Sequence, residues 1–168
     1  MHTSMRPTLL AAAAALAAIL LAGAFAVSAG ADAGPPWGPE TPNFNLEVIL
    51  QQPSGGGSGF GHVKFRQPND GDKIVYLDTW VRDLLPHHSY VLQRAVDAPN
   101  AVDGSCTSGA WLDLGAISTD DRGTGSAALF RNLPSPIGTS FDIHFRVVDA
   151  GTLTPVLESG CYQFTVSL

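Results

Sequence analysis

The strongest constraint on the fold is an alternation of apolar and polar residues with a period of two, which recurs from Leu46 onward. In the clearest segment, residues 141–148, apolar residues occupy the odd-numbered positions, and polar residues occupy the even-numbered positions up to Arg146. Side chains of a β-strand point alternately to its two faces, so this pattern predicts strands with one buried and one solvated face. No stretch after Leu46 has the apolar periodicity of a helix.

The same alternation, bounded by turn residues, predicts further strands along the chain. The predicted segments are residues 46–51, 62–66, 73–82, 89–96, 111–119, 126–131, 141–148 and 162–168, with 155–159 either a short extra strand or a bend. Turns are expected at residues 68–71 and 120–123, and the glycine-rich segment 55–61 is expected to be a flexible hairpin tip. The predicted fold is all-β: a β-sandwich or Greek-key barrel of about eight strands.

The first residues have the composition of a secretory signal peptide. A short start with one basic residue, Arg6, precedes an apolar run from Leu9 to Val27, and A-x-A cleavage sites follow at residues 29–31 and 31–33. The sequence therefore predicts a signal peptide over 1–33, a Pro-rich lead-in over 34–45 and one domain over 46–168. The expected location is secreted or extracytoplasmic, in the cell envelope, with no stable membrane span after cleavage. A retained anchor is the alternative, because the apolar run approaches the length that spans a bilayer.

The charge of the chain limits its partners. The net charge is −6, and the only lysines are Lys64 and Lys73. Without a basic stripe, nucleic acid is excluded as a partner, and so is an acidic membrane surface. An unknown protein or an envelope component is the partner that remains.

The two cysteines, Cys106 and Cys161, predict a disulfide, because an even pair is normally oxidised in an exported protein. A bridge across a loop of about 55 residues would stabilise the fold by roughly 4 kcal/mol in the chain-entropy model. Two thiolates that bind a soft metal are the alternative, which the lack of a C-x-x-C spacing disfavours.

Three separated stretches together resemble the copper/zinc superoxide dismutase family. They are Gly61–Gln67 with the following turn and Leu84–Tyr90, then Gly104–Gly109 with Asp113–Asp120, and finally Ser159–Cys161. The resemblance implies an eight-stranded Greek-key barrel. It also implies a disulfide from the Gly-Cys-Thr-Ser loop to the last strand, which here joins Cys106 to Cys161.

Most positions that match the family's metal site carry other residues. Val91 and Gln93 stand where the resemblance places two copper histidines, and neither is a good copper ligand. The chain has no histidine between Cys106 and Asp113, so the loop with the zinc histidines is missing. The resemblance therefore implies the fold and argues against the activity.

The weak metal candidates that remain are Asp113, at the family's zinc aspartate, His144, at its last copper histidine, and the adjacent His87 and His88. Adjacent histidines point to opposite faces of a strand, although both can reach one side at a turn. Three neutral imidazoles are usual for zinc or copper, so exposed loop histidines are the alternative. Glu158 replaces the arginine that the family uses to attract an anion, and a carboxylate repels one.

A candidate binding surface consists of Trp80, Tyr76 and Arg82, which share one face of the predicted strand 73–82. Exposed Trp and Tyr beside Arg are typical of interfaces. Packing against a neighbouring loop is the alternative, since large aromatic residues are mostly buried. Trp111, directly after the cysteine loop, is expected to pack beneath the disulfide.

The sequence as a whole favours a secreted, non-catalytic β-sandwich domain that binds a protein or envelope component, without cofactors or catalytic residues. A superoxide dismutase-like metalloprotein with a remodelled site that holds copper, zinc or both is the enzymatic alternative. A third hypothesis is a structural module without a specific ligand. A serine hydrolase is disfavoured because no Gly-x-Ser-x-Gly motif occurs.

Overall fold

The structure of the chain is a computed structural model. It describes residues 46–53, 57–68, 72–97, 102–107 and 109–167. The predicted signal peptide, the Pro-rich lead-in and most of the turn predicted at 68–71 lie outside the described residues. No helix in the described ranges is long and apolar enough to cross a membrane.

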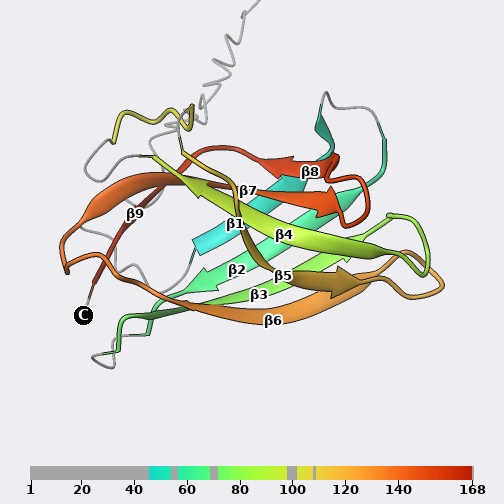
Figure 1. The fold of residues 1–168 in the computed structure, drawn as a ribbon, viewed down its shortest axis with the longest axis horizontal. Coiled ribbons are helices and arrows are strands. Elements are labelled where there is room, and N and C mark those ends of the chain that lie inside the picture. Colours follow the sequence, from blue (N-terminus) through green and yellow to red (C-terminus); the bar gives the residue numbers. More distant parts are fainter. Residues whose placement is uncertain (1–45, 54–56, 69–71, 98–101, 108, 168) are drawn as a thin grey trace, which may run out of the picture. The chain divides into compact units, whose positions relative to one another are not determined.

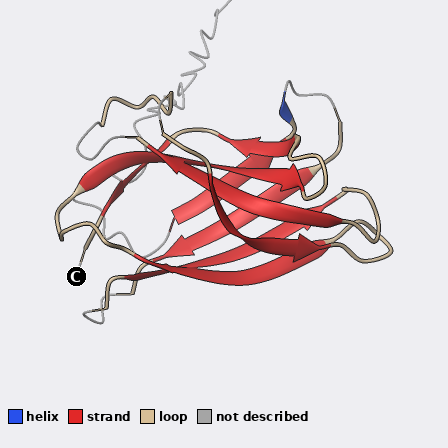
Figure 2. Cartoon of the chain, in the orientation of Figure 1, coloured by secondary structure: helices blue, strands red, loops and turns tan. Residues whose placement is uncertain are grey.

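The described elements are β-strands and loops, apart from one short helical turn after the first strand (Figures 1 and 2). The strands are β1 (Leu46–Gln51), β2 (Phe60–Arg66), β3 (Ile74–Arg82), β4 (Ser89–Val96), β5 (Leu112–Ser118), β6 (Gly125–Asn132), β7 (Ser140–Asp149), β8 (Pro155–Ser159) and β9 (Tyr162–Thr165). The prediction of an all-β chain is confirmed. The segment 155–159, for which the sequence allowed either a strand or a bend, is a strand.

The strands form one antiparallel sheet that curls into a nearly closed barrel (Figure 1). Its order is β5-β4-β7-β8-β1-β2-β3-β6, with β9 also paired to β7. The end strands β5 and β6 lie against each other, and they share one isolated bridge, Thr119 to Gly125, in place of a ladder. Across this seam the spatial order β7-β4-β5-β6 is that of a Greek key.

The alternation seen in the sequence explains which residues enter the barrel. In β1 the residues are alternately buried and exposed, beginning with buried Leu46, and β3 alternates in the same way from Val75. Aromatic rings form the centre of the core. The ring of Phe65 meets the ring of Phe164 edge-on, with 4.8 Å between their centroids, and it lies 6.2 Å from the ring of Phe145.

Strands β8 and β9 lie in succession along the same edge of β7. Arg146 pairs with Glu158 of β8, and Ile143 pairs with Tyr162 of β9. Between the two ladders the hydroxyl of Ser159 accepts the hydrogen bond of the Phe145 N–H at 2.9 Å. A side chain thus satisfies the backbone donor where the ladder is interrupted.

Two predicted boundaries differ from the structure for local reasons. Gly61 belongs to β2 and not to a hairpin tip, because it pairs with Leu50 and Val81 inside the ladders. A Cβ atom there would meet Leu50 and Leu157 at 3.0 Å, so glycine lets the core side chains approach the strand. The ladder of β9 ends at Thr165, because the N–H of Val166 donates to the carbonyl of Thr139 in a loop.

The turn between β5 and β6 confirms the prediction at 120–123 and is packed against the turn before β4. The N–H of Gly123 donates to the carbonyl of Asp120, and the Gly123 carbonyl accepts from the N–H of Leu84. Gly123 has a φ of 73°, and a Cβ atom on it would lie 2.0 Å from the Leu84 oxygen. Glycine is required here by both the backbone angle and the close approach.

We expect Gly123→Ala to lower the free energy of unfolding by about 2 kcal/mol or more, because it combines a strained φ with a backbone clash. Gly160→Ala is the matched control: nothing lies within 4 Å of its Cβ position, and its φ is not in the left-handed region. Urea unfolding of both variants measures the difference, and equal stability of the two would contradict this account of the turn.

Candidate functional site

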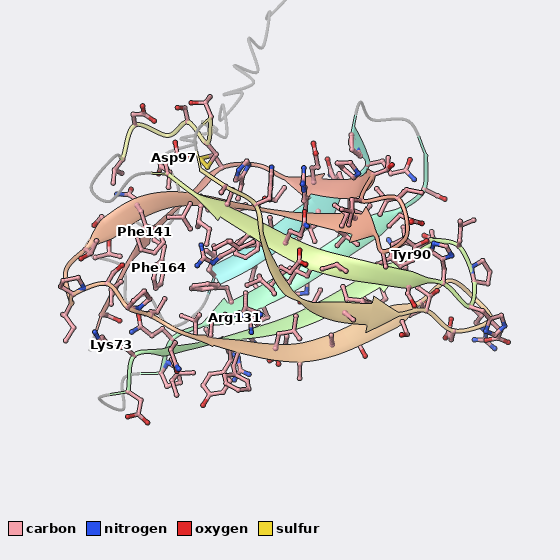
Figure 3. All side chains as sticks on the ribbon, viewed as in Figure 1. Lys73, Tyr90, Asp97, Arg131, Phe141 and Phe164 are labelled. Carbon is pink, nitrogen blue, oxygen red and sulfur yellow. A yellow bond between two sulfur atoms is a disulfide. The ribbon has the colours of Figure 1, made fainter. Side chains whose placement is uncertain are left out.

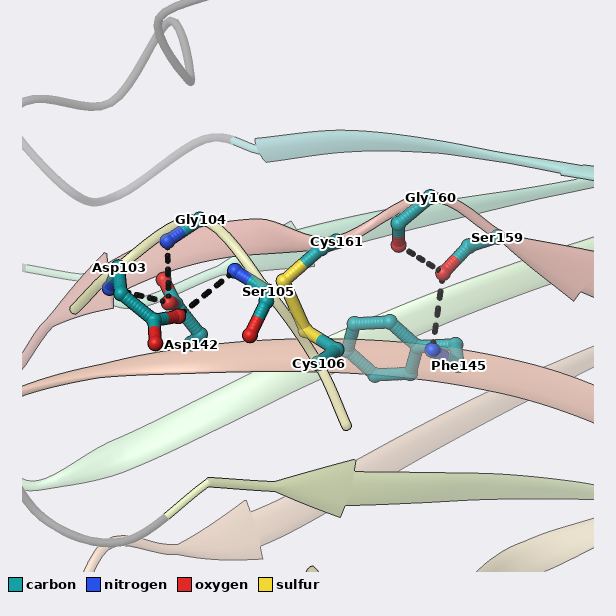
Figure 4. The surroundings of a disulfide bond; sticks show 9 residues. All are labelled: Asp103, Gly104, Ser105, Cys106, Asp142, Phe145, Ser159, Gly160 and Cys161. Atoms are coloured by element: carbon teal, nitrogen blue, oxygen red, sulfur yellow. Dashed lines mark hydrogen bonds between the residues drawn. A yellow bond between two sulfur atoms is a disulfide. The ribbon is translucent and has the colours of Figure 1, made fainter. Parts of the chain in front are cut away.

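The cysteine loop is attached by a disulfide to the junction between β8 and β9, and by a buried carboxylate to β7 (Figure 4). Cys106 and Cys161 are bonded, with 5.5 Å between their Cα atoms, as predicted. Asp142 of β7 is fully buried, and one of its oxygens accepts hydrogen bonds from the N–H groups of Asp103 and Gly104. The loop between β4 and β5 is therefore held over the outer surface of β7.

A chain of polar contacts crosses the outer surface of β5, β4 and β7. Gln93 is buried and stands opposite Arg146 in the β4–β7 ladder. Its amide oxygen accepts from Nε of Arg146 at 2.7 Å, and its amide nitrogen donates to the carboxylate of Asp113 at 2.7 Å. Two of the positions singled out in the sequence, Gln93 and Asp113, are thus brought into contact, by a hydrogen bond between their side chains.

His144 belongs to a stack of planar groups on the same surface. The ring of Trp111 lies over the ring of His144, with 4.3 Å between centroids and 33° between planes. The guanidinium carbon of Arg146 lies 4.0 Å from the centroid of the Trp111 ring. Trp111, which we expected beneath the disulfide, therefore packs against an imidazole and a guanidinium.

Burial lowers the pKa of His144 below 6.5, and the charge of Arg146 lowers it further, against the opposing effects of Asp97 and Glu158. The neutral imidazole is favoured here because water does not reach the ring freely and a cation lies nearby. A neutral ring also stacks on Trp111 without bringing a second cation beside Arg146.

The adjacent histidines His87 and His88 lie far from this stack. His88 is hydrogen-bonded to Asp149, which stands five residues beyond His144 on β7, a rise of about 16 Å. The hydrogen bond from His88 is the main cause that lowers the pKa of Asp149 to about 2, and the N–H groups of Thr152 and Gly151 add to it. His87 is exposed at a left-handed backbone angle of 50°.

The four weak metal candidates are therefore divided among separate surroundings. Asp113 is bound to Gln93, His144 is stacked on Trp111, and His88 is paired with Asp149. Within the described residues, no three side chains of the His, Cys, Asp or Glu type form a group that would hold a metal. The geometry on this surface suits polar and stacking contacts.

The candidate binding surface lies on the other side of the barrel, over β2, β3 and β6. We call it the β2–β3–β6 face, and it comprises Phe60, Arg66, Tyr76, Trp80, Arg82 and Phe130. Tyr76 and Trp80 are each 38% exposed and Phe130 is 59% exposed. The predicted set Trp80, Tyr76 and Arg82 does lie on one face, and the alternative of packing against a loop does not account for this exposure.

The two arginines of this face lie over its aromatic rings. The guanidinium carbon of Arg82 is 5.1 Å from the ring centroid of Phe60 and 5.8 Å from that of Trp80. Arg66 lies 6.0 Å from the ring of Tyr76 and forms an ion pair with Asp78. Phe60 and Phe130 could not be assigned to this face from the sequence, because only the ladder registers place them beside Arg82 and Tyr76.

Comparison of the chain with models of protein families gives no match, and comparisons with curated proteins and with solved structures give none either.

We expect the depressed pKa of His144 to make the fold less stable as the pH falls below about 6.5. In the unfolded chain His144 takes up a proton near that pH, whereas in the folded chain it does so only at its lower pKa. The free energy of unfolding therefore decreases as the pH falls from the unfolded pKa to the folded one. Urea unfolding at a series of pH values measures it. His144→Gln should lose less stability over this range than the wild type, and His87→Gln, which alters an exposed ring, should behave like the wild type. Identical pH profiles of wild type and His144→Gln would contradict the prediction.

Proposed function

We propose that the chain is a non-catalytic, extracytoplasmic binding module whose β2–β3–β6 face captures a protein with an acidic surface. The observation that carries the proposal is the exposure of Tyr76, Trp80 and Phe130 side by side with two arginines. No described segment of the chain covers these rings. Large aromatic residues and arginine are the residue types enriched at protein interfaces and among the contacts that dominate affinity.

The face is also organised in advance for binding. Arg82 is held over two rings, and the rings of Phe60 and Trp80 meet edge-on at 6.3 Å. Residues on neighbouring strands lose little conformational freedom when a partner docks, because the ladders already fix their backbones. Less ordering on association leaves more of the interaction energy as affinity.

The charges on this face favour an acidic partner. Asp78 pairs with Arg66, so these two opposite charges compensate each other within the face. Lys64 makes no ion pair with any described residue, and Arg82 has only a long, exposed contact of 3.7 Å to Asp83. Two cations thus remain available on a chain whose net charge is −6, which favours contact with acidic groups.

The disulfide supports the extracytoplasmic part of the proposal. A cysteine pair at bonding distance is compatible with folding in an oxidising compartment, where such bridges persist. The predicted signal peptide agrees with this location.

We expect Trp80→Ala to weaken partner capture about tenfold or more, as loss of a central aromatic contact does at protein interfaces. Extracytoplasmic extract is passed over immobilised full-length chain, and proteins retained by the wild type are compared with those retained by Trp80→Ala and by Lys64→Glu. The matched control is Leu85→Ala, which shortens a side chain of 62% exposure away from this face.

Support requires a protein that is retained by the wild type and by Leu85→Ala but released by Trp80→Ala and by Lys64→Glu. Urea unfolding of each variant checks that the barrel is intact. The proposal fails if every retained protein binds the variants as well as the wild type, or if only a polysaccharide is retained.

We further propose that the barrel is of the copper/zinc superoxide dismutase type and holds no metal. The Greek-key strand order and the disulfide between a loop and the C-terminal strands support this proposed fold type. The separation of His88 from His144 argues against the metalloprotein alternative, in which both would share a site.

We expect purified full-length chain to contain copper and zinc well below one atom per molecule and to lack superoxide dismutase activity. Elemental analysis after incubation with each metal, followed by gel filtration, provides the measurement. One tightly held copper per chain, lost in His144→Gln, would overturn the metal-free proposal and restore the enzymatic alternative.

A further inference from the structure

A cavity of about 240 Å³ lies inside one end of the barrel. Its apolar wall is formed by residues of four strands, namely Phe65, Val75, Leu77, Leu114, Phe141 and Ile143. Figure 3 shows Phe141 and Phe164 at this end, while Tyr90 lies toward the opposite end. The cavity reaches the seam between β5 and β6, where Leu114 and Arg131 lie on its border.

A guanidinium without a partner faces this apolar space. Arg94 follows Tyr90 and Leu92 in the inward-facing series of β4 and pairs with Phe145 in the ladder. It lines the cavity and is half-buried, and no described residue accepts a hydrogen bond from it or forms an ion pair with it. Partial burial of a cation without a partner is unfavourable, so its retention on the inward face of β4 favours the binding of a counter-ion.

A second cation stands beside it at the border of the cavity. Arg131 crosses the seam and donates to the carbonyls of Asp113 and Leu114 on β5. Burial lowers the pKa of Arg94, and the charge of Arg131 lowers it further. The two guanidinium groups therefore repel each other, and an anion between them would relieve both the burial and the repulsion.

One carboxylate, that of Asp97, also lines the cavity. Its charge acts on His144, on the outer side of the barrel. Among the described residues that line the cavity, two cations stand against one carboxylate, in a chain that is acidic overall.

We propose that this cavity binds a small apolar carboxylate, with the carboxylate between Arg94 and Arg131 and the apolar tail among the core side chains. The site is distinct from the β2–β3–β6 face and does not depend on the function proposed for that face. Guanidinium groups match carboxylates in geometry and charge, and a concave, mostly apolar wall with a small number of polar groups is typical of small-molecule sites.

The cavity volume limits the ligand to about ten non-hydrogen atoms, since an apolar cavity of roughly 150 Å³ accommodates benzene. Octanoate is a carboxylate of that size. Octanamide has nearly the same shape without the charge, so the pair separates the effect of the two arginines from that of the apolar wall.

The test is isothermal titration of the full-length chain with octanoate and with octanamide. We expect octanoate to bind at one site about tenfold more tightly than octanamide, as a charge-assisted hydrogen bond predicts. Arg94→Met, which keeps an unbranched apolar chain, should abolish this preference. The control Arg122→Met removes an arginine from the β5–β6 turn and should keep the preference.

A second variant tests whether the ligand binds inside the barrel. Val96→Phe enlarges a side chain that lines the cavity and should weaken the binding of both octanoate and octanamide. Thermal unfolding without ligand checks each variant, and Arg94→Met should be at least as stable as the wild type because it removes an unpaired buried charge. The proposal is overturned if octanoate does not bind, if the two ligands bind equally, or if the preference survives in a folded Arg94→Met.

Discussion

The seam between β5 and β6 is the constraint on which the rest of the barrel depends. A sheet that curls must either pair its two end strands or protect their backbone groups. Here the turn end of the seam is joined by the bridge from Thr119 to Gly125, and the other end is spanned by Arg131, which donates to two carbonyls of β5. Because a side chain replaces a backbone ladder at that end, the interior beside Arg131 is not completely filled by the core.

Strand β7 connects the interior of the barrel with its outer surface. Its inward residues, such as Phe145, lie in the aromatic core, while His144 and Arg146 point outward to the stack on Trp111. It also pairs with β4, β8 and β9, and its Asp142 binds the cysteine loop. Asp142 therefore fixes the loop to the strand that carries the polar surface, and the disulfide fixes it to the junction of β8 and β9.

Much of the fold follows from local sequence patterns. The period-two alternation located β1 with the observed bounds, because this strand has one buried and one solvated face. The pattern was less informative at Gly61, where glycines look like a loop although tight packing by Leu50 and Leu157 requires a residue without a side chain. The pattern also did not decide whether β8 is a strand or a bend, because a strand of five residues becomes stable only through pairing with β7 and β1.

By itself the sequence determined the all-β class, most strand positions, the disulfide and the shared face of Tyr76, Trp80 and Arg82, since each follows from spacing along one strand or from cysteine chemistry. Only the tertiary structure decided which strands become neighbours. It separated His88 from His144, added Phe60 and Phe130 to the aromatic face, and brought Arg131 of β6 beside Arg94 of β4. The physical reason is that these contacts join residues distant in the chain, and their distances depend on strand order and register, which local periodicity does not encode.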